Sequence, residues 1–170
     1  MATLDMAAKV SRRLVIDASV ARSCGGEDAT YPTSVNCRDF LQAVLVICHR
    51  VVMTPDIREE WDNHQSKFAR SWLRSMVAKR KLEALPEIPL DNELWNKVEQ
   101  FAETDKERAD MLKDLRLVEA AIATDKTVIS LDENTARKLF RKAAPEIEAL
   151  KMIVWVNPDK TEEQPIELVA

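Results

Sequence analysis

Four carboxylates occupy positions from which they could share one divalent cation. Asp17 ends the apolar run RLVID, and Asp132 closely follows the apolar run TVIS. Asp114 precedes a stretch rich in alanine, leucine and valine, and Glu60 lies in the segment TPDIREEW. Acids gathered at one place repel one another, and a cation such as Mg²⁺ or Mn²⁺, which prefers oxygen ligands, relieves that repulsion. We therefore expect the four acids to form one metal site.

Three of these acids also have simpler explanations. Aspartate favours the turns that follow strands, which would account for Asp17 and Asp132. We expect Asp114 to open a helix, where the helix dipole stabilises an acid by about 0.3–1 kcal/mol. A helix cap alone would therefore account for Asp114.

The choice between the neighbouring Glu59 and Glu60 depends on the phase of their helix. Ile57, Trp61 and His64 define its expected inward stripe. At about 100° per residue, Glu60 lies roughly 60° from Ile57, whereas Glu59 lies roughly 160° away. We therefore expect Glu60 to flank the core and join the site, and Glu59 to face solvent.

An α/β fold would position these acids. Short apolar runs predict strands at residues 13–17, 50–53, 127–131 and 152–156, with residues 82–89 irregular or briefly extended. Helical periodicity predicts helices at residues 35–49, 55–65, 67–81, 91–102, 114–124 and 133–141. The alternation predicts a three-layer α/β/α sandwich around a parallel sheet, in which functional groups gather at the carboxyl ends of the strands.

The segment KFARSWLRSMVAKRK contains six basic residues and no acid. On a helix, Lys67, Arg70, Arg74 and Lys81 would fall within about 60° of one another, opposite an apolar face. Such a ridge would bind RNA phosphates without reading bases, although an ordinary solvated face is the plain alternative.

Composition narrows the remaining function classes. The 170 residues suit one domain, and a net charge of −4 repels phosphate unless basic residues cluster. The only glycines, Gly25 and Gly26, are adjacent, which excludes glycine-rich nucleotide-binding loops. Cys24, Cys37 and Cys48 form no CxxC pair, so no zinc site is indicated. Without a membrane-spanning run or a signal-peptide core, we expect a cytoplasmic protein with no membrane partner.

The motifs that carry the four acids resemble those of PIN-domain ribonucleases. VIDASV would hold the first acid, Asp17, and TPDIREEW the second, Glu60, six residues after Thr54. DLRLVEAAIATDKTVISLD would hold the third and fourth, Asp114 and Asp132, eighteen residues apart. The resemblance covers residues 13–156 in register, and this last segment is its most recognisable part.

The resemblance implies an activity, a topology and partners. Similar proteins hydrolyse RNA phosphodiester bonds by metal-activated water, using Mg²⁺ or Mn²⁺, on a parallel sheet of strand order 3-2-1-4-5. Many form homodimers, and many are toxins of toxin–antitoxin pairs, which implies an antitoxin protein as a further partner. Ser19 and Ser130 match hydroxyl positions near such sites, and Asn134 could supplement Asp132.

The chain departs from the compact members of that family in its length. We expect a PIN-like domain at residues 13–157 with an enlarged helical section at residues 68–111. Residues 1–12 would be a leader, and residues 158–170 a charged, loosely held tail. The extra length weakens the toxin expectation more than the fold expectation.

Two other functions fit parts of the pattern. A phosphoryl-transfer enzyme of the haloacid-dehalogenase type also places an Asp after a strand, but it needs a second Asp where this chain has Ser19. A non-catalytic PIN-like module that binds RNA or protein would show the same fold. Loss of one or more of the acids would mark such a module, and all four positions are filled.

Overall fold

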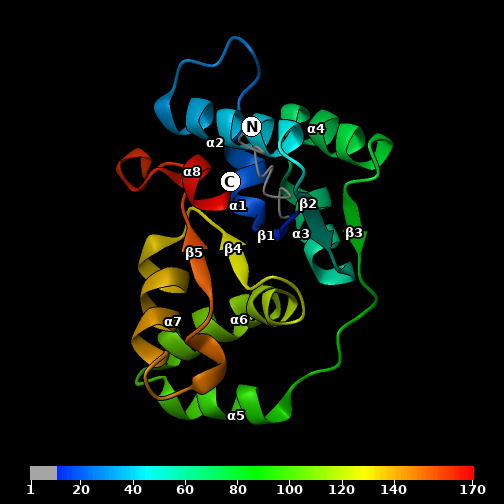
Figure 1. Ribbon diagram of the computed structural model, residues 1–170. Coiled ribbons are helices and arrows are strands. Elements are labelled where there is room, and N and C mark those ends of the chain that lie inside the picture. The colour runs from blue at the N-terminus through cyan, green and yellow to red at the C-terminus, as the bar shows by residue number, and fades with distance from the viewer. Residues whose placement is uncertain (1–10) are drawn as a thin grey trace, which may run out of the picture.

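A five-stranded sheet forms the centre of the computed structural model, which describes residues 11–170 (Figure 1). The strands are β1 Arg13–Ile16, β2 Arg50–Met53, β3 Leu82–Ala84, β4 Thr127–Ile129 and β5 Val154–Val156. Their order is β3-β2-β1-β4-β5, and each neighbouring pair is parallel. The predicted α/β class and strand order are therefore confirmed.

Helices cover both faces of the sheet and complete a three-layer sandwich. They are α1 Ala18–Ser23, α2 Pro32–Val46, α3 Pro55–His64, α4 Lys67–Ala78, α5 Asn92–Phe101, α6 Asp105–Ile122, α7 Lys138–Ala143 and α8 Pro165–Val169, with the short turns η1 Glu133–Arg137, η2 Glu148–Leu150 and η3 Thr161–Glu163. The helices α2 and α4 pack together on one side of the sheet, and α6 and α7 pack together on the other (Figure 1).

The order in which the chain adds strands to the sheet switches from one side of β1 to the other, at the boundary between β1 and β4. It first travels from β1 to β2 and β3, and it then returns to the other side of β1 to form β4 and β5. Ile16 at the end of β1 pairs with Ile129 at the end of β4. Residues that follow these two strands therefore emerge side by side, at the kind of switch point where open α/β sheets bind ligands.

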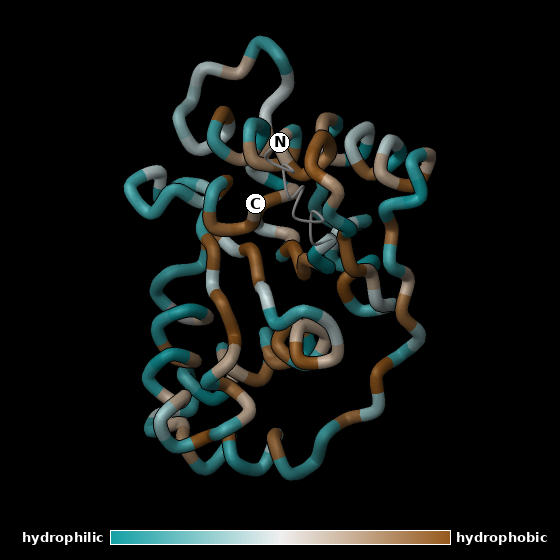
Figure 2. Tube along the Cα trace, in the orientation of Figure 1, coloured by the Kyte–Doolittle hydropathy of each residue, from teal (hydrophilic) through white to brown (hydrophobic). Residues whose placement is uncertain are grey.

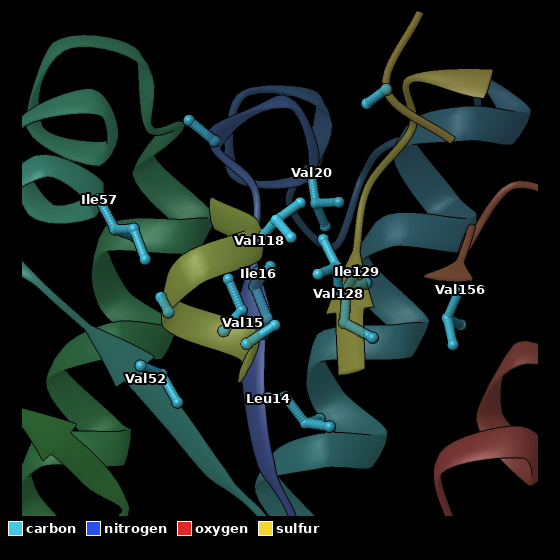
Figure 3. Close-up of a cluster of buried hydrophobic side chains, with 14 of the residues drawn as sticks. Leu14, Val15, Ile16, Val20, Val52, Ile57, Val118, Val128, Ile129 and Val156 are labelled. Atoms are coloured by element: carbon cyan, nitrogen blue, oxygen red, sulfur yellow. The ribbon is translucent and has the colours of Figure 1, made fainter. Parts of the chain in front are cut away.

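Continuous apolar strands build the core. Leu14, Val15 and Ile16 of β1 are fully buried, and Figure 3 shows them among apolar side chains from β2, β4 and the covering helices. Hydrophobic colour follows the strands in Figure 2, whereas the outward turns of the helices are hydrophilic. Burial on both faces is typical of parallel strands, which explains why their sequences show no alternation of polar and apolar residues.

Side-chain caps mark the starts of α3 and α6, the two helices that flank the carboxyl edge of the central strand. Thr54 Oγ1 accepts a hydrogen bond from the Ile57 N–H at 3.2 Å, and Pro55 occupies the first helical position. Thr104 Oγ1 caps α6 in the same way through the Glu107 N–H at 3.1 Å. The cap at Thr104 places Asp114 well inside α6.

The expectation that Asp114 opens its helix is therefore wrong, and its position cannot be ascribed to the helix dipole. The helix begins at Asp105, nine residues earlier. Most of the residues between Asp105 and Asp114 are polar and lie on or near the surface, so the sequence shows no apolar stripe that would predict this first half of the helix.

The charged tail expected at residues 158–170 is folded rather than loosely held. Pro165 and Val169 of α8 are buried. The buried His49 links the two ends of the described chain, because its Nδ1 accepts the Arg12 N–H at 3.0 Å and its Nε2 donates to the Val169 carbonyl. Burial lowers the pKa of His49, which keeps the ring neutral for these two contacts. The expected leader falls largely on residues 1–10, outside the described residues.

Candidate acidic site at the switch point

Asp17 is fixed at the carboxyl edge of the sheet by two hydroxyl groups. It follows β1 directly, and its N–H donates to the Ile129 carbonyl at 2.8 Å. Ser19 Oγ donates to Asp17 Oδ2 at 2.7 Å, and Ser130 Oγ donates to the same oxygen at 2.9 Å. The two serines predicted to support the site therefore both contact Asp17, and both of their hydrogen bonds fall on the same one of its two carboxylate oxygens.

The same hydroxyl groups attach the segment that carries Asp132. The Asp132 N–H donates to Ser130 Oγ at 3.0 Å, and the Leu131 N–H donates to Ser19 Oγ at 3.2 Å. Ser130 thus bridges the Asp17 carboxylate and the backbone of Asp132. This arrangement links the ends of β1 and β4 through side chains as well as through the sheet.

A single turn of π-helix, η1, follows Asp132 and is hydrogen-bonded to its backbone carbonyl. The Arg137 N–H donates to the Asp132 carbonyl at 3.2 Å, five residues back. The buried Arg137 guanidinium donates to Glu133 at 2.7 Å and holds both oxygens of Glu163 at 2.7 and 2.8 Å. π-Helical turns occur often at functional sites, and here the turn anchors the segment after Asp132. Asn134 is exposed on this turn.

Asp114 joins these acids from α6. Its pKa is raised to about 7, first because burial removes water from the carboxylate and then because Asp17 and Asp132 are negatively charged. Asp17 and Asp132 therefore lie close enough to Asp114 for their charges to raise its pKa. A divalent cation bound beside these carboxylates would oppose that repulsion.

The helix α3 forms the wall opposite α6. Trp61 Nε1 donates to the carbonyl of Ile16, the last residue of β1, at 2.9 Å, and this fixes the helix beside Asp17. Arg116 of α6 reaches across to Asp56 at 2.9 Å. Between the walls lies a cleft of about 380 Å³. Its acidic residues are Asp17, Asp56, Glu59, Glu60 and Asp114, and its basic residues are Arg22, His64, Lys113 and Arg116.

Glu60 does line this cleft, but it is not half-buried as expected. Its side chain is 58% exposed and lies 3.7 Å from His64 Nε2. Glu59, expected to face solvent, lines the cleft as well. Only Ile57 and Trp61 of this helix are buried, so the covered stripe is narrower than the sequence indicated and helix phase alone does not separate the two glutamates.

The donor set fits a hard divalent cation in chemistry and charge. The candidate ligands are all carboxylate oxygens, which are the ligands that such a cation prefers, and the charges of Asp17 and Asp132 add to burial in raising the pKa of Asp114. Across residues 11–170, no three acidic, histidine or cysteine side chains are already gathered around one point for a metal ion. Of the two histidines, His49 lies in the core, whereas His64 lines the cleft beside Glu60.

Sequence reasoning missed the basic residues of the cleft. Arg22 lies five residues after Asp17, and Lys113 directly precedes Asp114. Their proximity in sequence to two predicted acids was the available signal. It was not usable without the structure, because the directions of the side chains depend on where α1 and α6 begin.

The predicted basic ridge is only partly present. Lys67, Arg70 and Arg74 are exposed on α4, whose opposite face buries Trp72 and other apolar residues. The helix ends at Ala78, so the expectation for Lys81 is wrong. Its ammonium group instead donates to the carbonyls of Leu45 at 2.7 Å and Ile47 at 3.0 Å, at the C-terminal end of α2.

Comparisons with known proteins add no family assignment. No protein-family model matches the chain, and no curated protein matches its sequence. In residues 11–170, no helix combines the length and apolar character needed to cross a bilayer.

Proposed function

We propose that this protein is a metal-dependent endoribonuclease of the PIN-domain type. The observation that carries the proposal is the convergence of Asp17, Asp114 and Asp132 at the switch point of the sheet, with the pKa of Asp114 raised to about 7. The order of these acids along the chain and the motifs that hold them support the same assignment. RNA is the proposed substrate, and Mg²⁺ or Mn²⁺ the proposed cofactor.

The carboxylates would hold the cation, with Glu60 or Glu59 completing the set from α3. A bound divalent cation supplies Lewis acidity and makes water at the site a stronger nucleophile at neutral pH. Ser19 and Ser130 orient Asp17 by donating to one of its oxygens, at 2.7 and 2.9 Å. Ser130 also fixes the backbone of Asp132, so the ligand positions at the ends of β1 and β4 are held before substrate arrives.

A cleavage assay on mixed RNA substrates tests the proposal. Wild-type protein should cleave with Mn²⁺ and stop when a chelator is added. Asp17→Asn should lose most of the activity and remain folded, because the amide oxygen still accepts hydrogen bonds from Ser19 and Ser130. Equal cleavage by the wild type and the Asp17→Asn protein, or cleavage that continues in chelator, would reject the proposal.

The melting temperature separates this function from the alternative of a non-catalytic binding module. A cation that binds only the folded state raises the melting temperature. Mn²⁺ should therefore stabilise the wild type, and Asp17→Asn should abolish most of that rise. A module without a metal site would melt at the same temperature with Mn²⁺ and with chelator.

A further inference from the structure

Two cations in the acidic cleft form no ion pair with the part of the protein that the structure describes. Arg22 lies in the last turn of α1, and Lys113 directly precedes Asp114 in α6. Both side chains line the cleft, both residues are exposed, and neither forms an ion pair with any residue between 11 and 170. They are therefore free to bind an anion from outside.

The other two basic residues of the cleft differ in this respect. Arg116 is committed to Asp56 at 2.9 Å and to the Ile88 carbonyl at 2.8 Å. His64 lies 3.7 Å from Glu60. These contacts stay within the protein and support the cleft walls. Arg22 and Lys113 thus differ from the two basic residues of the cleft that already contact other parts of the protein.

The location of the two residues indicates the chemistry of the ligand. Arg22 is carried by the helix that starts after Asp17, and Lys113 is the neighbour of Asp114, so each cation flanks one acid of the cluster. The charge of Lys113 is close enough to lower the pKa of Asp114, although the two do not pair within 4.0 Å. A ligand that contacts both Arg22 and Lys113 must carry negative charge. It must also bind next to acids that would hold a metal ion, and a phosphate ester can do both.

We infer that Arg22 and Lys113 bind phosphate groups of a single-stranded nucleic acid and hold the strand across the acidic cluster. The guanidinium of Arg22 suits a bidentate contact to phosphate oxygens from α1, and Lys113 supplies a point charge from α6. This inference rests on the proposed function, since it names how the substrate would be held. It adds residues that are separate from the four predicted acids.

Binding of a fluorescently labelled single-stranded RNA, followed by anisotropy in Ca²⁺, tests the inference without relying on cleavage. The double variant Arg22→Ala/Lys113→Ala should bind more weakly than the wild type. Its log–log salt dependence should flatten by about 0.7 for each lost contact. The control Lys106→Ala/Lys138→Ala removes the same charge from exposed positions outside the cleft and should bind like the wild type. The melting temperature of each variant shows whether it is folded.

The outcomes separate this inference from the proposed hydrolysis. It is overturned if the wild type does not bind RNA, or if the double variant and the control lose the same affinity. Displacement of the RNA by inorganic phosphate at the same concentration as the RNA also overturns it, because the ligand would then be a small phosphate. Binding that needs Arg22 and Lys113, with no cleavage in Mn²⁺, would support the inference and reject hydrolysis. Cleavage of RNA by the wild type, with RNA binding unchanged in the double variant, would support hydrolysis and reject the inference.

Discussion

At the scale of single residues, the acids of the site differ in the groups that surround their carboxylates. Asp17 is satisfied by Ser19 and Ser130, whereas Asp114 is half-buried beside other negative charges. The sequence predicted that these acids meet, because acids after parallel strands share one edge of the sheet. It could not predict which acid bears the electrostatic penalty, since that depends on burial within α6.

Asp114 should make the metal-free protein less stable as pH rises. Its folded pKa of about 7 lies above its ordinary value of 3.8, so the folded state binds the proton more tightly than the unfolded state does. This contribution is complete below pH 3.8 and is lost as pH rises through 7. Asp114→Asn should therefore stabilise the protein at pH 8 in chelator, by on the order of 1–4 kcal/mol, and change little at pH 3.5. Thermal melts at both pH values measure this, and equal stabilisation at the two would contradict it.

Glu60, rather than Glu59, remains the predicted fourth ligand, and the paired variants decide. Both residues line the cleft, but Glu60 is the position that matches the motif. Glu60→Gln should weaken the Mn²⁺-induced rise in melting temperature and slow RNA cleavage several-fold. Glu59→Gln, which removes the same charge from the adjacent position, should behave nearly as wild type. The opposite pattern would assign the ligand to Glu59.

At the scale of elements, the strands and the apolar faces of the helices were predicted well, and the helix ends were predicted poorly. β2 was placed at its observed bounds and α3 within one residue, because an apolar run and a Thr-Pro cap define them. The start of α6 and the end of α4 were missed, because exposed residues there carry no apolar period. The error at the end of α4 wrongly added Lys81 to the basic ridge, and the error at the start of α6 left Lys113 outside the helix that carries Asp114.

The shortened ridge on α4 gives a test of its own. Arg70 and Arg74 are exposed on the same helix and form no ion pair within residues 11–170. Arg70→Ala/Arg74→Ala should weaken RNA binding to a similar extent for different sequences, and should flatten the salt dependence by about 0.7 per lost contact. The Mn²⁺-induced rise in melting temperature should be unchanged. Affinity and salt slope equal to those of the wild type would leave this face as an ordinary solvated surface.

At the scale of the whole molecule, the C-terminal helix completes the fold. Val169 is 1% exposed, whereas its neighbour Leu168 is 44% exposed. Val169→Ser should lower the unfolding free energy by on the order of 2 kcal/mol, because an apolar side chain leaves the core and a hydroxyl group enters it. Leu168→Ser, on the same short helix, should change stability by less than about 0.5 kcal/mol. Urea unfolding of the two variants measures the difference, and equal losses would show that the helix does not pack as described.

The position of β1 in the middle of the sheet also matters while the chain is being made. Leu14 to Ile16 leave the ribosome before the strands on either side of them, and Val15 pairs with Val128, whose synthesis follows 113 residues later. At roughly 5–20 residues per second, one edge of this apolar strand stays unpaired for about 6–23 seconds on every nascent chain. An exposed strand edge of this kind is what chaperones bind and what aggregates grow from. The yield of folded protein should therefore depend on how fast the ribosome translates the segment between the two strands.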